Sequence, residues 1–440
     1  MGSEIAAKSP SLVLAAGGDS LITRRLSTNT EDDFVSVMRL VGSADVAFTN
    51  LETTIHDFKG YPAAQSGGAW MVSPPFIADE LKRAGFNLLS RANNHTMDWG
   101  VEGMLATSEI LDRAGLTHAG VGVNLGEARR PAYRDTSKGR VALISASSTF
   151  APWGRAGHGR RDLQGRPGLN PLRYETVCSV EKQYFDLLKR LSTELGLSSG
   201  AGARPEEMML LGARFAVGDE TSMEMIVNEG DFQENLGSVR EAARQADWVI
   251  VSLHTHERGK DNYTPAAFVV KFARACIDSG ADVVVMHGAH VLRGVEVYRN
   301  RPIFYSLGNF IYQSRSLEKL PEDIYERYGL GLDARPGDAF DLMQQRYLES
   351  REPRVDGGAP HLTGSTHSLL AMVTFENRRL SSLRLYPVTL GPEMHRIHSG
   401  YPRLVRGELG EKIVRMVAEL SRPFGTLVEY VDGVGEADIA

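Results

Sequence analysis

Short apolar runs alternate with amphipathic stretches along most of this chain. Segments such as 31–41 and 101–116 repeat their apolar residues at helical spacing. The apolar runs between such segments are nearly continuous, which is typical of parallel strands buried on both faces. The clearest of these predicted strands are 12–16, 45–49, 86–89, 247–253 and 281–286. Strands that alternate with helices in this way predict an α/β fold.

The hydrophobic pattern stops abruptly after the run at 86–89, and a polar cluster follows. Asn93, Asn94, His95 and Asp98 all lie before the helix predicted to start at Val101. The cluster therefore falls on a loop between a buried strand and a helix, where α/β proteins place their chemistry. A plainer alternative is that the asparagines make a turn and Asp98 caps the helix.

Two carboxylates occupy the same kind of position after earlier strands. Asp19 follows the run at 12–16 in a predicted turn, Gly17-Gly18-Asp19, and Glu52 follows the run at 45–49. The carboxyl ends of parallel strands lie along one edge of a sheet, so these two side chains are expected to be neighbours. Two such carboxylates repel each other unless they are protonated, hydrogen-bonded or shared by a metal ion.

Histidines follow the later strands. Of the 12 histidines, five stand just past predicted strands, namely His95, His254, His256, His287 and His290. Single histidines are more often hydrogen-bonded core or surface groups than ligands, but here they share strand ends with Asp19, Glu52 and Asn94. Imidazole, carboxylate and amide oxygen together suit divalent Mn, Fe or Zn. Two such ions would form the clamp used in hydrolysis of phosphoryl and related centres.

Composition excludes several other classes of protein. The net charge of −6, without a Lys/Arg block, argues against nucleic-acid binding. No apolar run approaches the ~20 residues of a membrane helix. The two cysteines, Cys178 and Cys276, are too few for a disulfide framework. We therefore expect a cytoplasmic chain, with a removed leader sequence as the open alternative.

The chain is expected to form one domain over 10–440 with two insertions. The first, at about 152–232, is mixed and polar, and the second, at about 314–366, is charged and rich in Pro and Gly in places. A hairpin and a helix within 369–430 would complete the core. The Arg-rich stretch 147–170 is either a solvated loop or a flap whose arginines face an anionic substrate. We expect the insertions to decide the substrate.

Five motifs resemble those of the CapA-type poly-γ-glutamate capsule synthesis proteins, a family similar in turn to the calcineurin-like metallophosphoesterases. The match runs in order from about Leu12 to Phe310, and the blocks at 93–95 and 305–310 are the most specific. The resemblance implies a two-sheet α/β sandwich flanked by helices, with a dinuclear metal site at the strand ends. The matching motifs are Gly18-Asp19, Asn50-Leu51-Glu52, 93–100, 287–294 and 302–310.

The resemblance also implies roles for individual residues. Asp19 would be a first-site ligand, Glu52 the bridging carboxylate and Asn94 a second-site ligand. His95 would be the general acid, oriented by Asp98. The remaining metal ligands would be His254, His287 and His290, and the residues expected to bind substrate are Asn50, Arg293 and Asn309.

The chain departs from the phosphoesterase pattern at three places. Ser20 and Leu21 follow Asp19 where that pattern has Asp-x-His, and Glu52 stands where that pattern has Asp. His287 and His290 are three residues apart, whereas the pattern has a closer His-x-His. The first site is therefore one imidazole short. Residues two apart on an extended chain point the same way, so His256 either supplies the missing nitrogen or binds substrate beside His254. The plainer alternative is an exposed His256 hydrogen-bonded to Glu257.

These observations predict a metal-dependent hydrolase, in which metal-activated water attacks a phosphoryl or acyl centre and His95 protonates the leaving group. The acyl branch includes γ-glutamyl amides. The substrate is expected to be an anionic small molecule or polymer. The alternative function is a non-catalytic, metal-containing accessory protein in capsule polymer synthesis or export. The lack of a predicted membrane segment favours the enzyme.

Overall fold

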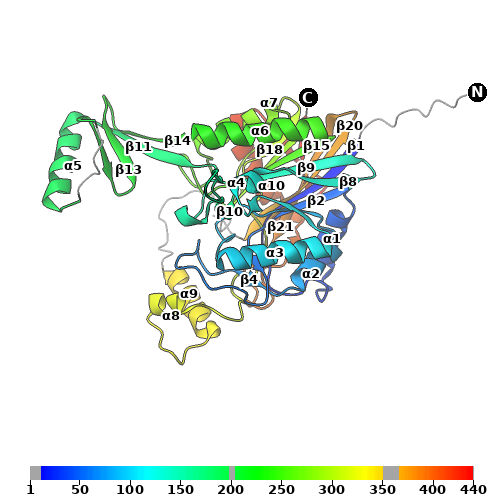
Figure 1. Ribbon diagram of the computed structural model, residues 1–440. Helices are drawn as coiled ribbons and strands as arrows, with labels where there is room; N and C mark the ends of the chain where they lie inside the picture. Colours follow the sequence, from blue (N-terminus) through cyan, green and yellow to red (C-terminus); the bar gives the residue numbers. More distant parts are fainter. Residues whose placement is uncertain (1–10, 198–203, 350–365, 440) are drawn as a thin grey trace, which may run out of the picture.

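Two facing β-sheets with helices on their outer sides form the body of the molecule (Figure 1). The computed structural model describes residues 11–197, 204–349 and 366–439. Strands β1, β2, β5 and β6 of the larger sheet run parallel to one another. In the smaller sheet, β9, β15, β16 and β18 are likewise parallel.

The larger sheet has the order β23-β24-β21-β20-β1-β2-β5-β6, with β19 paired to β1 and β22 paired to β21. Its strands are β1 (Ser11–Leu21), β2 (Val46–Leu51), β5 (Leu88–Ser90), β6 (Thr117–Ala119), β19 (Asn309–Tyr312), β20 (His367–Glu376), β21 (Arg379–Thr389), β22 (Arg403–Leu404), β23 (Val428–Val431) and β24 (Val434–Ala437).

The smaller sheet has the order β17-β18-β16-β15-β9-β8. Its strands are β8 (Ala132–Thr136), β9 (Gly139–Ser147), β15 (Trp248–His254), β16 (Val283–His287), β17 (Val295–Tyr298) and β18 (Arg301–Phe304). Three minor sheets are formed by β3 (Thr54–Ile55) with β4 (Val72–Ser73), by β7 (Val121–Gly122) with β10 (Gly168–Leu169), and by β11 (Tyr174–Val180), β12 (Glu207–Leu210), β13 (Ala213–Val217) and β14 (Ser222–Val227).

The α-helices are α1 (Asp32–Gly42), α2 (Ile77–Arg83), α3 (Gly100–Ala114), α4 (Leu125–Arg129), α5 (Lys182–Glu194), α6 (Glu229–Gln245), α7 (Ala267–Asp278), α8 (Glu322–Tyr328), α9 (Pro336–Glu349) and α10 (Gly407–Ser421). Single 3₁₀ turns lie at Pro152–Gly154 and Arg422–Phe424. No helix in the described part of the chain is long and apolar enough to cross a bilayer.

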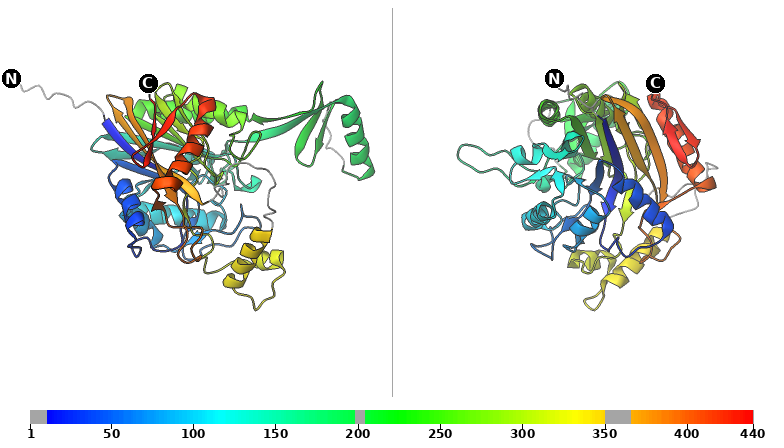
Figure 2. Two further views of the ribbon diagram at one scale, coloured as in Figure 1. Left: turned by 180° about the vertical axis from the view of Figure 1, so that it is seen from behind. Right: turned by 90° about the vertical axis from the view of Figure 1, so that its right-hand side faces the viewer.

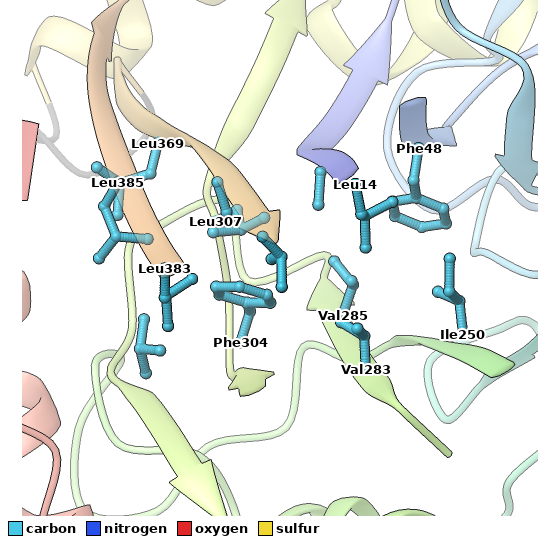
Figure 3. Close-up of a cluster of buried hydrophobic side chains, with 14 of the residues drawn as sticks. Leu14, Phe48, Ile250, Val283, Val285, Phe304, Leu307, Leu369, Leu383 and Leu385 are labelled. Carbon is cyan, nitrogen blue, oxygen red and sulfur yellow. The ribbon is translucent and has the colours of Figure 1, made fainter. Parts of the chain in front are cut away.

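The main hydrophobic core lies between the two sheets. Leu14 and Phe48 from the larger sheet face Ile250 and Val285 from the smaller one (Figure 3). Successive residues of a strand point to opposite faces, so the neighbours of these residues form the outer cores. Val249 and Val251 pack under α6 and α7, whereas Ala15 and Ala47 pack under α1 and α2. Because both faces of the central strands are covered, their sequences are almost uniformly apolar.

The predicted α/β sandwich is confirmed: two sheets face each other and helices flank them. One local prediction is wrong. The sequence predicts a turn at Gly17-Gly18-Asp19, but β1 continues through these residues to Leu21, with a register shift between Ala16 and Asp19. The irregular strand has a steric reason. A Cβ on Gly18 would lie 1.8 Å from the carbonyl oxygen of Gly308, so only glycine allows β1 to approach the turn before β19.

Two segments extend beyond the sandwich (Figures 1 and 2). We call the first the arm: it comprises β11–β14 and α5, and it has its own small core around Val180, Phe185 and Met208. The second carries α8 and α9, which pack on Trp70 from the body. In the arm, β11 continues to Val180 and α5 begins at Lys182. Part of the predicted insertion 314–366, and the ends of the predicted domain 10–440, fall outside the described residues.

Candidate metal centre

The polar and ionisable residues of the site lie side by side at the carboxyl ends of the parallel strands. In the larger sheet, Asp19 is in register with Asn50, and Asn50 with Ser90, the last residue before the polar loop. In the smaller sheet, His254 is in register with His287. Asp19 also receives a 2.8 Å hydrogen bond from the backbone N–H of Gly288, which joins the two sheets at the site. The pairing of neighbouring strands therefore brings together residues that are far apart in the sequence.

Six of these side chains form two groups with the geometry to hold metal ions. Asp19, His254 and His287 make one group, and the other consists of Glu52, His256 and His290. Within each group, the candidate ligand atoms lie within 4.8 Å of one another.

The two groups are contiguous. His254 Nε2 lies 3.1 Å from His256 Nε2, a nitrogen of the other group. Glu52 Oε1 lies 3.8 Å from His254 Nε2 and 3.7 Å from His290 Nε2, so this carboxylate is close to both groups.

Unpaired buried oxygens test whether the site suits metal ions. Glu52 is fully buried, and neither of its carboxylate oxygens has a hydrogen-bond partner among the described residues. Asn94 Oδ1 is also buried without such a partner, while its Nδ2 is 3.4 Å from the Gly67 carbonyl oxygen. Leaving an ionised carboxylate buried and unpaired costs several kcal/mol. Oxygen and imidazole donors without cysteine fit divalent Mn, Fe or Zn. The residues present therefore fit such ions.

The electrostatics of the two carboxylates differ. Burial by itself raises the pKa of Asp19, but the hydrogen bond to His287 and the nearby imidazoles outweigh burial and lower that pKa well below its usual value. Burial raises the pKa of Glu52 far above its usual range, and the negative charge of Asp19 raises it further. Without a cation, the protein thus holds one of the two carboxylates ionised at the expense of the other.

Burial also keeps two of the histidines neutral. It lowers the pKa of His254 well below its usual value, and the neighbouring His256 adds to this effect. The pKa of His256 falls to about 4, mainly through burial and then through His290. Neutral imidazoles have a lone pair to give to a metal ion.

A second layer of polar contacts fixes the orientation of the candidate ligands. Ser252 Oγ is 2.7 Å from His287 Nε2. The other nitrogen of that ring, Nδ1, faces Asp19 and lies 3.3 Å from its Oδ1. Asn309 Oδ1 lies 2.7 Å from His290 Nδ1. Partners of this kind set the tautomer and direction of ligand rings.

Ser252 was not singled out from the sequence, although it could have been found, because it stands two residues before His254 on β15 and therefore shares its face. Asn93 was placed in the polar cluster, but the sequence assigned it no role. It donates to Asn50 Oδ1 at 3.1 Å and to the Leu51 carbonyl at 2.8 Å, contacts that only the folded chain creates.

The three residues expected to bind substrate are all buried. Asn50 donates to Asp19 Oδ1 at 2.8 Å, and Asn309 contacts His290, so both hold candidate ligands. Arg293 is 1% exposed and donates from Nε to the Asn262 carbonyl oxygen at 3.0 Å. The structure does not bring Arg293 into either ligand group. These positions favour support of the site over direct substrate contact.

His95 and Asp98 form a pair beside the two groups. His95 Nδ1 lies 2.6 Å from Asp98 Oδ2, which also accepts a 2.7 Å hydrogen bond from the backbone N–H of Met71. Both side chains are nearly inaccessible. Burial raises the pKa of Asp98, while His95 lowers it in part. Asp98 does not cap α3, whose N-cap is Trp99, so the plain alternative for Asp98 does not hold.

His256 is partly exposed and lies with Glu52 and His290, not with Asp19. The His256 imidazole, expected to supply the missing nitrogen beside Asp19, therefore belongs to the group of Glu52 and His290. Glu257 has other partners. It accepts hydrogen bonds from Thr149 Oγ1 at 2.9 Å and from Thr255 Oγ1 at 2.8 Å.

With the site in view, the comparisons define the class of protein. Residues 13–314 match the family described as "Bacterial capsule synthesis protein PGA_cap". The chain is also 37% identical over 431 residues to the "Uncharacterized protein y4sH" of Sinorhizobium fredii, covering 96% of this chain and 92% of that protein. The chain therefore belongs to the PGA_cap family of CapA-type capsule synthesis proteins.

More distant relatives carry functional names. The chain is 24% identical to the "Capsule biosynthesis protein CapA" of Bacillus anthracis, over 68% of this chain and 60% of that protein. It is 26% identical to the "Probable polyglutamine synthesis accessory protein Rv0574c" of Mycobacterium tuberculosis, over 61% and 56% respectively. The structure of Haemophilus influenzae NAD nucleotidase overlaps with a TM-score of 0.34 and 11% identity, over 93% of this chain and 56% of that one, which is too distant to inform activity.

Proposed function

We propose that this protein is a hydrolase that depends on two divalent metal ions. Asp19, His254 and His287 would hold one ion, and His256 and His290 the other, with Glu52 shared between them. The observation that carries this proposal is the buried Glu52 carboxylate, which has no hydrogen-bond partner among the described residues and lies within 4 Å of imidazoles from both groups. Asn94, whose Oδ1 also has no partner in the part of the chain that the structure describes, is the proposed further ligand of the second ion.

A bound pair of divalent ions supplies the Lewis acidity that activates water and polarises the bond to be cleaved. The chain itself positions these ions. Asn50 and the Gly288 N–H hold Asp19, and Ser252 and Asn309 hold His287 and His290. With four polar partners already in contact, the ligands need little rearrangement when the ions bind.

His95 is the proposed general acid. Its Nδ1 is engaged by Asp98, so Nε2 is the nitrogen left to hold and deliver a proton to the leaving group. Asp98 is itself fixed by the Met71 backbone N–H. A proton donor fixed in this way contributes about 10²–10⁴-fold to the rate of a hydrolytic step.

The proposed substrate class is an anionic phosphoester or amide, including γ-glutamyl amides. Support comes from the family and from relatives named for capsule biosynthesis and polyglutamine synthesis. The name "accessory protein" of one relative keeps the second candidate function open. In that case the protein would hold metal for structural reasons and turn over no substrate.

Metal analysis combined with a substrate panel tests the proposal. The purified protein is loaded with Mn²⁺, Fe²⁺ or Zn²⁺, the metal per chain is measured, and phosphoesters and γ-glutamyl amides are assayed. We expect two ions per chain and turnover of at least one substrate class that is abolished by chelation. Metal uptake without turnover would favour the accessory function. A protein that takes up no metal under any condition would exclude both.

A further inference from the structure

Glu257 is a buried carboxylate that the proposed mechanism does not use. It follows His256 directly, is 8% exposed and belongs to neither of the two ligand groups. Side chains alternate in direction along this segment. The rings of His254 and His256 meet on one side, whereas Thr255 Oγ1 meets Glu257 Oε2 at 2.8 Å on the other. Glu257 therefore faces away from the candidate metal ligands.

Hydroxyl groups from three segments surround the Glu257 carboxylate. They come from the loop after β9, the loop after β15 and the first residue of β11, and they belong to Ser148, Thr149, Thr255 and Tyr174. Burial, together with the charge of Glu257, raises the pKa of Tyr174 above its usual value, so this hydroxyl keeps its proton and donates. A buried carboxylate is costly unless it is hydrogen-bonded, and these donors offset that cost.

Thr149 connects Glu257 to the backbone of His256. Its Oγ1 lies 2.9 Å from Glu257 Oε1 and accepts a 2.8 Å hydrogen bond from the backbone N–H of His256. A carboxylate only accepts hydrogen bonds, so the Thr149 hydroxyl donates to Glu257 and presents a lone pair to the His256 N–H. Glu257 thereby sets the direction of both hydrogen bonds, and consecutive hydrogen bonds strengthen each other.

This support matters because His256 lies beyond the end of its strand. β15 ends at His254, so the His256 N–H is held by the Thr149 side chain in place of a neighbouring strand. The centre of the His256 ring lies 5.7 Å from that of His290, in the group that also contains Glu52. Polar partners behind a metal ligand commonly change metal affinity by about 10–100-fold.

We propose that Glu257 is a positioning residue for the second metal ion, the ion of the Glu52, His256 and His290 group. Through Thr149 it holds the backbone of His256, so that the imidazole stays with the other two ligands. This inference rests on the proposed function, because it requires that the group binds metal. A role in loop stability alone would leave the affinity for the second ion unchanged, so the two roles differ in a measurable quantity.

Stepwise titration of the full chain with Mn²⁺, followed by calorimetry, tests this role without turnover. Thr149→Val removes the hydroxyl with little change of shape. It should weaken binding of the second ion about 10–100-fold and leave the first at the parent value. Glu257→Gln keeps the volume, but its amide N–H can donate to Thr149 and reverse the hydrogen bond. Its affinity for the second ion should fall in the same way.

The matched control is Thr255→Val, which makes the same side-chain change and also removes a donor to Glu257. The His256 N–H keeps its bond to Thr149 in this variant, so both Mn²⁺ affinities should equal those of the parent. Equal weakening in Thr149→Val and Thr255→Val would show that a general loss of order in the loop changes the affinity. That result would overturn the positioning role.

A double-mutant cycle shows whether Glu257 acts through His256. His256→Ala removes the ligand itself and identifies the binding step that belongs to its group. Adding Glu257→Gln to His256→Ala should then cause no further loss of affinity, because substitutions that act through one contact are not additive. Additive losses would contradict the proposal. Thr149→Val in the same background gives a second cycle if Glu257→Gln does not fold.

The titration also separates this inference from the proposed function. If the parent binds two Mn²⁺ ions and the Glu257 and Thr149 variants match it, only the role of Glu257 is overturned. A parent that binds no Mn²⁺ overturns both. If the affinities change as expected while the substrate panel shows no turnover, Glu257 keeps its role and the hydrolase proposal falls.

Discussion

At the scale of single residues, the centre depends on side chains whose roles can be separated by substitution. His95→Gln should lower turnover about 10²–10⁴-fold, because the proposed proton donor is lost. Metal per chain should stay at the parent value, since His95 belongs to neither ligand group. Steady-state rates and metal analysis on the same preparation check both parts.

The matched control for His95 is Asp98→Asn, which preserves shape but weakens the partner of Nδ1. Its turnover should fall less than that of His95→Gln, and the pH–rate profile should shift. Parent-like turnover in His95→Gln would remove this residue from the mechanism.

Glu52 gives the clearest test of a shared carboxylate. In the metal-free protein its burial, with no hydrogen-bond partner from the described segments, is a cost, so Glu52→Gln should leave the melting temperature equal to or above that of the parent. With Mn²⁺ present the order should reverse, because the parent gains stability from bound metal and the variant loses it. Thermal melts with and without chelator, beside metal counts, provide the measurement. The same gain in both proteins would mean that Glu52 holds no metal.

At the scale of elements, the close approach of β1 to the turn before β19 positions Asp19. Gly18→Ala places a methyl group 1.8 Å from the Gly308 carbonyl oxygen, so either β1 or the turn before β19 must shift. We expect a loss of about 1–3 kcal/mol or more in the free energy of unfolding, together with weaker metal binding. Urea titration and metal affinity measure the two effects.

Gly42→Ala is the control for Gly18→Ala. Gly42 ends α1, and a Cβ there would meet no atom within 4 Å. Its stability should be equal to the parent or up to about 1 kcal/mol higher, because alanine restricts the unfolded chain more than glycine does. Similar losses in both variants would point to a general effect of backbone substitution, not to the contact with Gly308.

Helix α2 is anchored through Glu80. This buried carboxylate accepts hydrogen bonds from the backbone N–H groups of Leu26 at 2.9 Å and Ser27 at 2.7 Å. Burial raises the pKa of Glu80, but its hydrogen bonds with Ser27, Leu26 and Arg25 outweigh burial and bring the pKa below its usual value. The carboxylate therefore stabilises the folded state only while it is ionised.

The lowered pKa of Glu80 makes the stability of the folded protein depend on pH. The stabilisation by Glu80 is complete above the unfolded-state pKa of about 4.3 and is lost as the pH falls through the lower folded-state pKa. Glu80→Gln should cost about 1.5–3 kcal/mol at neutral pH. The difference between parent and variant should shrink as the pH falls to about 3. Denaturant titrations across this range check it, and a constant difference would contradict the ionic origin.

At the scale of the whole molecule, the sandwich and the arm have separate cores. The arm joins the body through one pair of strands, with Thr176 opposite Met225 at its base. Replacing 177–224 by Asn-Gly would close β11 and β14 as a hairpin. We expect unchanged metal per chain and a change of less than about 1 kcal/mol in the stability of the body, because the deletion removes the separate core of the arm and replaces a long connection by a short one.

Metal analysis and denaturant melts of the shortened chain provide the test. A loss of metal would show that the arm supports the centre. Unchanged metal with altered affinity for γ-glutamate oligomers would instead place the arm in substrate recognition.

The sequence by itself determined the strand runs, the order of helices and strands and the chemical types at the strand ends. These follow from local hydrophobic period and from the rule that parallel strands end at one edge. Asp19, Glu52, His254 and His287 could be assigned to one site for this reason. The family resemblance extended the prediction to the facing sheets.

Only the tertiary structure decided which atoms meet. The grouping of His256 with Glu52 depends on how the two sheets face each other, and the contact of Asp19 with the Gly288 N–H joins residues 269 positions apart. Asn50 donates to Asp19 and Asn309 contacts His290, so both side chains face candidate ligands and not solvent. Such contacts arise from the packing of distant segments, and no local period in the sequence encodes them.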